Sequence, residues 1–419
     1  MDDDRAWGWS CADLVEISRG RDTPFYAHDL DGMKHAAKAL VASFSGASHL
    51  VAYAVKANSS GTVLRTLFEA GTGADVVSGS EMELALRCGA RPSDVVFSGV
   101  GKADAEIDAA IGAGVASIHV ESIEEIARVA ARANALGTRA NVSVRVNPSL
   151  AKEAIATHAH VATGHDEAKF GVLADDMPHA FASLRRHGEW VVPVGVSAHV
   201  GSQLTELEPY LASTRAIVPI ALEFRRQFAS TMGMIDTGGG FGIDYGKGCI
   251  LQPSDFVRAV RPLLESAGLG DLRHAIEPGR CLVGSHVVLV SRVLQTKTSP
   301  SRPELRWLLV DAGMNDLLRP ALYQANHRVA AIAGGSGALV PWRVVGPVCE
   351  SSDDFGLHEL PAEAPSLVCF RDAGAYGFTM ASRYNGRALP GEVFVSGGIV
   401  VGDVRREPSE TWVSERLRA

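Results

Sequence analysis

Residues 49–57 read HLVAYAVKA and are followed by NSSG at 58–61. The first part is a short apolar run, which is typical of a strand buried on both faces of a parallel sheet. A doubly wound sheet that binds a dinucleotide usually has G-x-G-x-x-G after its first strand, and NSSG does not fit that fingerprint. The end of this run therefore disfavours a Rossmann-like sheet.

Seven more runs of this kind follow, and they alternate with segments whose apolar residues have helical spacing. In chain order they are ADVVSGS (74–80), DVVFSG (94–99), SIHVES (117–122), NVSVRVN (141–147), VVPVGVSAHVGS (191–202), MGMIDTGGG (232–240) and RHAIEPGR (273–280). Eight strand-then-helix units predict a TIM-type (β/α)8 barrel over residues 30–285, because an open doubly wound sheet would need fewer strands.

The pattern changes after about residue 286, where β-rich runs are joined by turns. These runs are VVLVSRVLQTKT (287–298), LRWLLVDAG (305–313), LVPWRVVGPVCE (339–350), SLVCFRD (366–372) and GEVFVSGGIVVGDV (391–404). TPFYAHD at 23–29 has the same character. We expect residues 286–419 to form an all-β domain, to which residues 1–29 contribute a strand.

The composition narrows the class of protein. Hydrophobic residues make up 46% and charged residues 21%, as in globular domains, and the net charge of -8 argues against a nucleic-acid partner. The six cysteines are scattered without a C-x-x-C pair, so neither a zinc cluster nor a disulfide framework is expected. The acidic start has no signal-peptide core, and no apolar run reaches about 18 residues. We expect a protein of the reducing cytoplasm with no membrane span.

Polar residues stand where the strand candidates end, which is the functional face of a (β/α)8 barrel. Lys56 ends the first strand; it is either a surface lysine or an amine that forms a Schiff base with a carbonyl cofactor. His199 ends the sixth strand beside Ser202, and is either a structural histidine or a ring that stacks on a planar ligand.

Two further strand ends carry groups that suit an anion and a ring nitrogen. Gly238, Gly239 and Gly240 follow the seventh strand, and their N–H groups can converge on a phosphate. Glu277 ends the eighth strand and can hold a protonated pyridine nitrogen, although an ordinary ion pair would also explain it. Arg280 suits a phosphate or a carboxylate. Each motif alone is weak, but together they supply what a pyridoxal-phosphate site requires.

From residue 23 to about residue 397, the chain resembles the fold-type III pyridoxal-phosphate enzymes of the ornithine/diaminopimelate/arginine decarboxylase family. The motifs that carry the resemblance in the barrel are YAVKAN, DVVSGSE, FSGVGK, AKFGV, HVGSQ, GGGFG and EPGR. In the β domain they are DAGMNDLLRPALY, GPVCES and DAGAYGF. The resemblance implies a barrel with a C-terminal β domain, pyridoxal 5'-phosphate as cofactor, and a homodimer whose active sites are shared across the interface.

The resemblance also implies a role for each matching residue. Lys56 carries the cofactor, and Cys349 donates a proton from the second subunit. The implied cofactor contacts are His199 stacked on the ring, Glu277 at the ring nitrogen, and Ser202, Gly238, Gly239, Gly240, Pro278, Gly279, Arg280 and Tyr376 around them. The implied substrate contacts are Arg280, Arg319, Tyr323, Glu350 and Tyr376.

The chain departs from the family pattern at four places. Residues 195–199 read GVSAH where G-x-H-C-H is usual, and Ser80 replaces a usual glycine. The stretch SLAKEAIA near residue 150 is a few residues longer than is usual in the family, and YNGRALPGE lacks the usual Arg-Pro pair. None of these falls on an implied catalytic position, and only the insertion near residue 150 bears on substrate access.

Charge then indicates the substrate within the family. The distal end of meso-2,6-diaminopimelate has a carboxylate and an ammonium, which suit Arg280 with Arg319 and Glu350 respectively. We therefore expect decarboxylation of meso-2,6-diaminopimelate to L-lysine and CO2. The alternatives are a related decarboxylase that acts on ornithine, lysine or a natural-product intermediate, and a non-catalytic homologue.

Two other classes fit less well. An alanine racemase shares the two-domain plan, but its lysine motif continues with Tyr-Gly-His-Gly, whereas ANSSG follows Lys56. A metal-dependent barrel hydrolase would need a carboxylate motif beside the H-x-H pair of His158 and His160, and the sequence around them has none. We therefore expect no metal site.

Overall fold

The computed structural model describes residues 9–150, 168–248 and 250–418. The chain divides into two compact units, one of residues 34–243 and 249–281, the other of residues 1–33, 244–248 and 282–419. The insertion near residue 150 and the pair His158 and His160 lie outside the described residues.

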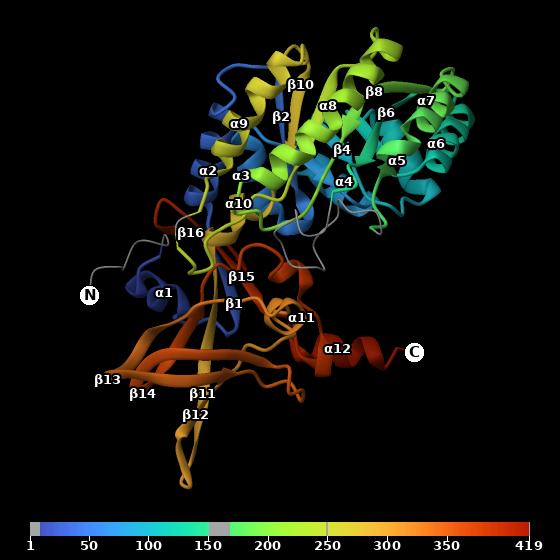
Figure 1. Cartoon of the computed structure of the whole chain (residues 1–419). Helices are drawn as coiled ribbons and strands as arrows, with labels where there is room; N and C mark the ends of the chain where they lie inside the picture. The colour runs from blue at the N-terminus through green and yellow to red at the C-terminus, as the bar shows by residue number, and fades with distance from the viewer. Residues whose placement is uncertain (1–8, 151–167, 249, 419) are drawn as a thin grey trace. The chain divides into compact units, whose positions relative to one another are not determined.

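The first unit is a closed barrel of parallel strands with helices around it (Figure 1). Its strands are β2 (His49–Ala54), β3 (Gly73–Val76), β4 (Val95–Phe97), β5 (Ser117–Val120), β6 (Ala140–Asn147), β8 (Val191–Ser197), β9 (Met234–Gly239) and β10 (Arg273–Glu277). Each strand pairs with the next in this order, and β10 pairs with β2 to close the ring. The (β/α)8 prediction is confirmed: six strands lie inside the predicted runs, and β3 and β6 begin one residue before theirs.

The helices that accompany these strands are α2 (Leu30–Ala42), α3 (Gly61–Glu69), α4 (Gly79–Arg87), α5 (Asp104–Ala113), α6 (Ile123–Leu136), α7 (Met177–Arg186), α8 (Glu208–Phe228) and α9 (Pro253–Ser266). Helix α6 shows how local sequence sets their limits. The Ser122 hydroxyl accepts a hydrogen bond from the Glu125 N–H at its start, and Gly137 ends it with a φ of 63°. Among the described residues, no helix is both long and apolar enough to cross a membrane.

The second unit is mainly β, as the turn-rich sequence predicts. Its strands are β1 (Phe25–Asp29), β11 (Val287–Ser299), β12 (Arg302–Val310), β13 (Val329–Val345), β14 (Asp354–Phe370), β15 (Gly391–Ser396) and β16 (Ile399–Val404). The sheet order is β12-β13-β14-β11-β1-β15-β16, and a further pairing of β11 with β12 joins four of the strands into a ring.

Strand β1 lies between two strands from the other end of the chain. It runs antiparallel to β11, with Tyr26 opposite Leu289, and parallel to β15, with Tyr26 opposite Glu392. This pairing buries Phe25 and Ala27 in an apolar core. The other buried members of that core are Trp9, Leu14, Ile17, Val288, Val290, Ile332, Cys369 and Val393.

The β unit is not entirely β, which corrects the expectation from the sequence. It contains the short helices α1 (Cys11–Ser18), α11 (Arg319–Tyr323) and α12 (Ser409–Arg416). Helix α1 buries Leu14 and Ile17, and the Ser10 hydroxyl caps it by accepting from the Asp13 N–H. Helices of one or two turns show too few apolar repeats to reveal a helical period.

Asp316 is a buried carboxyl group of this unit. Its Oδ2 accepts a hydrogen bond from the Gly313 N–H at 2.9 Å, and its Oδ1 has no hydrogen-bond partner among the described residues. Burial raises the pKa of Asp316 to about 7, against the opposing effect of the Gly313 N–H. The fold therefore favours the protonated form.

We expect Asp316→Asn to change the pH dependence of stability. Between about pH 4 and pH 7 the folded protein keeps a proton at Asp316 that the unfolded chain releases. The free energy of unfolding should therefore fall as pH rises through this window, by up to roughly 4 kcal/mol from this group, and the variant should lack that part. Urea denaturation of both proteins from pH 4 to pH 8 measures the difference. Identical pH profiles would show that Asp316 ionises normally in the fold.

Candidate active site

Lys56 lies at the carboxyl end of β2, in the short turn Val55–Ala57. Its Nζ forms an ion pair with Oδ2 of Asp75 on β3 at 2.9 Å. The Lys56 side chain is 37% exposed, whereas that of Asp75 is buried. A buried carboxylate thus holds the amine at the end of the barrel, and the amine stays accessible to a carbonyl compound, as a Schiff-base lysine must be.

Glu277, the last residue of β10, faces two histidines. Its Oε2 lies 3.3 Å from Nδ1 of His199, which follows β8, and its Oε1 lies 3.7 Å from Nδ1 of His119 on β5. Burial raises the pKa of Glu277, but the hydrogen bond and charge of His199, with smaller effects of His119 and Lys56, outweigh burial and lower that pKa below its usual range. The carboxylate is therefore ionised, as the partner of a protonated ring nitrogen must be.

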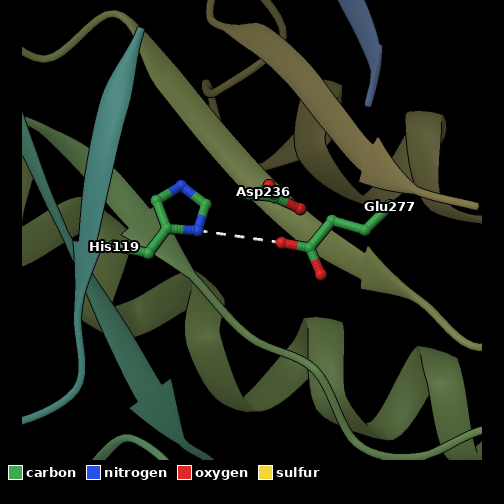
Figure 2. Close-up of side chains that lie close together, drawn as sticks. All are labelled: His119, Asp236 and Glu277. Atoms are coloured by element: carbon green, nitrogen blue, oxygen red, sulfur yellow. Dashed lines mark ion pairs between the residues drawn. The ribbon is translucent and has the colours of Figure 1, made fainter. Parts of the chain in front are cut away.

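Three buried titratable groups lie close together inside the barrel (Figure 2). They are His119, Asp236 of β9 and Glu277, and one ligand atom of each lies within 4.8 Å of the others. Burial, followed by the charge of Glu277, raises the pKa of Asp236, and burial lowers the pKa of His119. Such a trio has the donor types of a divalent-metal site, but a cation would need both carboxyl groups ionised. Burial thus shifts Asp236 and His119 towards their neutral forms, whereas the pKa of Glu277 is lowered.

Sequence reasoning missed Asp75, His119 and Asp236. Each is the one titratable residue of a mainly apolar strand run, in ADVV, SIHV and MIDT respectively. A polar group in such a position is costly to bury unless it has a partner, so these positions carried a usable signal. What the sequence does not provide is the neighbour that each one meets across the barrel.

A second buried network of charges was also missed. The Lys102 ammonium donates to the carbonyl oxygens of Gly99 and His119, both at 2.7 Å, and pairs with Glu125 at 3.2 Å. Glu121 pairs with Arg145 at 2.8 Å. These contacts join the segments that follow β4 and β5 to Arg145 of β6, and so fix the end of the barrel at which Lys56 lies.

The glycine loop after β9 approaches its neighbours too closely for side chains. A Cβ on Gly239 would collide with the carbonyl oxygen of Glu277, and Gly238 and Gly240 have positive φ values of 77° and 92°. The Gly238 N–H donates to Asp236 Oδ1 at 2.8 Å, and the nitrogen of Gly239 lies 3.2 Å from His199 Nδ1. We expected the N–H groups of all three glycines to face an anion. In this structure the N–H of Gly238 contacts Asp236 and that of Gly239 contacts His199.

The segment from Glu277 to Arg280 packs on the end of β2. The Pro278 carbonyl accepts from the Ala54 N–H at 2.9 Å, and a Cβ on Gly279 would lie 3.1 Å from that of Ala54. Arg280 begins the short helix α10 (Arg280–Val283), is buried, and donates from Nη2 to the Ser202 hydroxyl at 3.1 Å. The structure therefore gathers all the predicted barrel residues at the carboxyl ends of the strands.

Cys349 and Glu350 belong to the β unit. Both are exposed. The Cys349 N–H donates to Oδ1 of Asn385 at 3.0 Å, and Glu350 Oε1 accepts from the hydroxyl of Tyr384 at 2.5 Å. The Cys349 thiol and the Glu350 carboxylate are thus both exposed to solvent. Asn385 anchors the backbone of Cys349, and Tyr384 anchors the side chain of Glu350.

The other predicted residues of the β unit are Arg319, Tyr323 and Tyr376. Arg319 and Tyr323 are the first and last residues of α11, and Arg319 is buried. Tyr376 is half-buried and has a φ of 59°, which is uncommon for a residue with a side chain. A strained backbone at a residue of this kind is often found where a side chain must be aimed at a ligand.

The barrel residues fit pyridoxal phosphate by their chemistry. Lys56 offers an accessible amine to the aldehyde, and Glu277 offers an ionised carboxylate to the pyridine nitrogen. Asp75 Oδ1, His119 Nε2 and Asp236 Oδ2 are buried and have no hydrogen-bond partner among the described residues. Buried polar atoms of this kind are rare in folded proteins and mark a site that awaits a polar ligand or water.

Known proteins share both the fold and the sequence. Residues 30–284 match the family model described as the pyridoxal-binding domain of pyridoxal-dependent decarboxylases. The diaminopimelate decarboxylase of Helicobacter pylori is 36% identical over 375 residues, which are 89% of this chain and 90% of that protein. The diaminopimelate decarboxylase of Pseudomonas aeruginosa is 38% identical over 408 residues, which are 96% of this chain and 95% of that protein.

A solved structure extends the likeness to both units. The crystal structure of Helicobacter pylori diaminopimelate decarboxylase complexed with L-lysine matches with a TM-score of 0.89 and 35% identity, and covers 97% of this chain and 99% of that chain. The chain is therefore a member of the pyridoxal-dependent decarboxylase family, an enzyme that uses pyridoxal 5'-phosphate as its cofactor.

Proposed function

We propose that this enzyme decarboxylates meso-2,6-diaminopimelate to L-lysine and CO2, the last step of lysine biosynthesis. The observation that carries the proposal is the match, over about nine tenths of the chain, to proteins named diaminopimelate decarboxylase. The match includes both units, so it covers the β unit with Arg319 and Glu350 as well as the cofactor barrel.

Each of the proposed cofactor-binding residues has a role that follows from its chemistry. Lys56 would anchor the cofactor covalently, His199 would lie against its ring, and Glu277 would keep the ring nitrogen protonated. The remaining contacts come from Ser202, Gly238, Gly239, Gly240, Pro278, Gly279, Arg280 and Tyr376. When bound, pyridoxal phosphate supplies the sink for the electron pair that departing CO2 leaves behind. The Lys56–Asp75 ion pair of 2.9 Å supports this role, because it holds the amine at the strand end next to Glu277.

Cys349 delivers the proton that replaces the lost carboxylate on the α-carbon. An exposed thiol can exchange protons with solvent between turnovers, and Cys349 is exposed. We infer that the enzyme is a homodimer and that this thiol serves the barrel of the second subunit. The five described cysteines are all free, which agrees with a reducing compartment such as the cytoplasm.

Substrate selection depends on charge at the end that does not react. Arg319 with Arg280 binds the distal carboxylate, Glu350 binds the distal ammonium, and Tyr323 and Tyr376 complete the site. Ornithine and lysine have no carboxylate at that end, so two arginines would be in excess for them. A related decarboxylase for one of these amino acids is the alternative. A non-catalytic homologue is disfavoured because Lys56 and Cys349 are both present.

Substrate profiling tests the proposal directly. Release of CO2 from meso-2,6-diaminopimelate, L-lysine, L-ornithine and L-arginine is measured with purified enzyme and added pyridoxal phosphate. We expect the highest specificity constant for diaminopimelate. A higher value for ornithine or lysine would overturn the substrate assignment and leave the decarboxylase assignment in place.

We expect Arg319→Ala to reduce the specificity constant for diaminopimelate at least about tenfold. Deleting a charged hydrogen-bond partner costs roughly 1.5–3 kcal/mol, or about 10- to 150-fold. The visible absorbance of the bound cofactor should stay, because Arg319 belongs to the β unit and Lys56 to the barrel. Steady-state kinetics and absorbance spectra of both proteins measure these effects. Arg280 is a poorer probe, because it also donates to Ser202 in the cofactor site.

A further inference from the structure

Arg319 is held by two acceptors that the chemistry of the reaction does not require. Its Nη1 lies 2.9 Å from the hydroxyl of Tyr245 and 2.9 Å from Nε2 of His327. The guanidinium carbon also lies 5.0 Å from the centre of the Tyr245 ring. All three residues are buried, with exposed fractions of 6%, 8% and 2% in the order Arg319, Tyr245 and His327.

The direction of each hydrogen bond follows from the groups themselves. Arginine has no acceptor, so Nη1 must donate to both Tyr245 and His327, and these bonds use its two hydrogens. His327 Nε2 therefore carries no proton. Its Nδ1 lies 2.9 Å from the carbonyl oxygen of Arg371, which can only accept, so the ring carries its proton on Nδ1. Both bonds together fix the plane and the direction of the guanidinium group.

The two residues that hold Arg319, Tyr245 and His327, come from separate segments of the chain. Tyr245 comes from residues 244–248, which follow β9 in the sequence but belong to the β unit. This short loop is closed on itself, because Asp244 Oδ1 accepts from the N–H groups of Gly246, Lys247 and Gly248 at 2.7, 2.6 and 3.0 Å. His327 stands just before β13, and its ring packs edge-on against Tyr245 with centres 5.5 Å apart. Neither ring can turn without disturbing the other.

We propose that His327 and Tyr245 are positioning residues that determine how well the enzyme recognises the distal carboxylate of its substrate. They act through Arg319, by holding its guanidinium group in one orientation before the substrate arrives. An arginine that must be ordered on binding loses affinity, whereas a pre-ordered one does not. The inference rests on the proposed role of Arg319, and the experiment separates the two.

The experiment compares two ligands that differ by one carboxylate. L-lysine retains the distal carboxylate of the substrate, and 1,5-diaminopentane has the same chain and amines without it. Inhibition constants for both are measured against diaminopimelate with the holoenzyme and with four variants: Arg319→Ala, His327→Leu, His327→Gln and Tyr245→Phe. The quantity of interest is the preference for L-lysine over 1,5-diaminopentane, together with the cofactor absorbance of each variant.

We expect His327→Leu to lower this preference about tenfold and Tyr245→Phe about threefold, with the constant for 1,5-diaminopentane and the cofactor absorbance unchanged. Tyr245→Phe keeps the aromatic ring and so perturbs the fold least. His327→Gln should keep most of the preference, because its amide oxygen can still accept from Arg319. These results would assign the two residues to the carboxylate and not merely to stability.

Two outcomes would overturn the idea in different ways. If Arg319→Ala lowers the preference while His327→Leu and Tyr245→Phe leave it unchanged, the positioning role is wrong and the role of Arg319 stands. Equal loss of both ligands in the His327 and Tyr245 variants would indicate a merely structural role, which also refutes the inference. If Arg319→Ala itself leaves the preference unchanged, Arg319 does not bind the distal carboxylate, and the positioning role that depends on this contact is refuted with it.

Discussion

Enzyme with Lys56→Ala should lose both the visible absorbance of bound pyridoxal phosphate and its decarboxylase activity, the latter by at least about a thousandfold. The physical reason is that Lys56 stands at the end of β2 with a side chain that is 37% exposed, and its amine pairs with the buried Asp75 at 2.9 Å. No other lysine among the described residues is seen to pair with Asp75, and Lys102 is committed to Glu125 and two carbonyl oxygens. Absorbance spectra and CO2 release measure the two losses.

A lysine on the barrel surface provides the matched control. Lys34 pairs with Glu69 at 3.2 Å with both side chains well exposed, so Lys34→Ala should keep the absorbance and the activity. Added primary amines can restore part of the activity to the Lys56 variant, because they supply the missing amine from solution. Full activity of Lys56→Ala without any added amine would remove Lys56 from the mechanism.

Cys349→Ala should lower turnover by about a hundredfold or more and leave the cofactor absorbance intact. A positioned general acid typically contributes 10²- to 10⁴-fold, and Cys349 is an exposed thiol that belongs to the β unit, whereas Lys56 and Glu277 belong to the barrel. Cys11→Ala is the control, since Cys11 lies in the same unit and bonds only weakly to the Ala331 carbonyl at 3.8 Å. Turnover in the Cys349 variant equal to wild type would exclude the thiol as the proton donor.

Mixing the two inactive variants tests whether the thiol acts across subunits. A hybrid dimer of a Lys56→Ala chain with a Cys349→Ala chain would contain one site with both native groups and one with neither. At equal amounts, random exchange makes half of the dimers hybrid, so the mixture should regain about a quarter of the wild-type activity per site. If exchange is demonstrated with labelled subunits and no activity returns, the site is not shared.

The barrel and most of its site were predictable because of how parallel strands are buried. Strands covered on both faces read as continuous apolar runs, so each of the eight runs overlaps one observed strand. The carboxyl ends of such strands meet at one end of the barrel, which is why Lys56, Glu277 and Arg280 could be placed together from their positions alone.

Other features depend on partners that no local pattern specifies. Asp236 and His119 are neighbours only because barrel closure brings together the side chains of β5 and β9, which are three strands apart in the ring. Tyr245 and His327 meet Arg319 from segments 74 and 8 residues away in the sequence. Periodicity describes which face a residue occupies, whereas contacts of this kind are set by the closure of the whole fold.

The long strands of the β unit were underestimated for a compositional reason. Strands β13 and β14 extend over 329–345 and 354–370, but only 339–350 and 366–372 read as strands. The remainder contains AIAGGSGA and ELPAEAP, which are rich in residues disfavoured in strands. The pairing tolerates them through register shifts, with Gly334, Gly335 and Gly337 at positive φ. Pairing with the partner strand therefore outweighs the low intrinsic preference of these residues for the β conformation.

Strand β1 pairs with β11 and β15, which are synthesised much later, so β1 stays unpaired during most of translation. Ribosomes add about 5–20 residues per second, so the roughly 260 residues that separate β1 from β11 take on the order of 13–50 s to make. The chain can complete its barrel in that interval, while the apolar strand FYAHD waits with both of its edges unpaired. We therefore expect nascent chains released before residue 287 to present an aggregation-prone strand, and to depend on chaperones more than the full-length protein does.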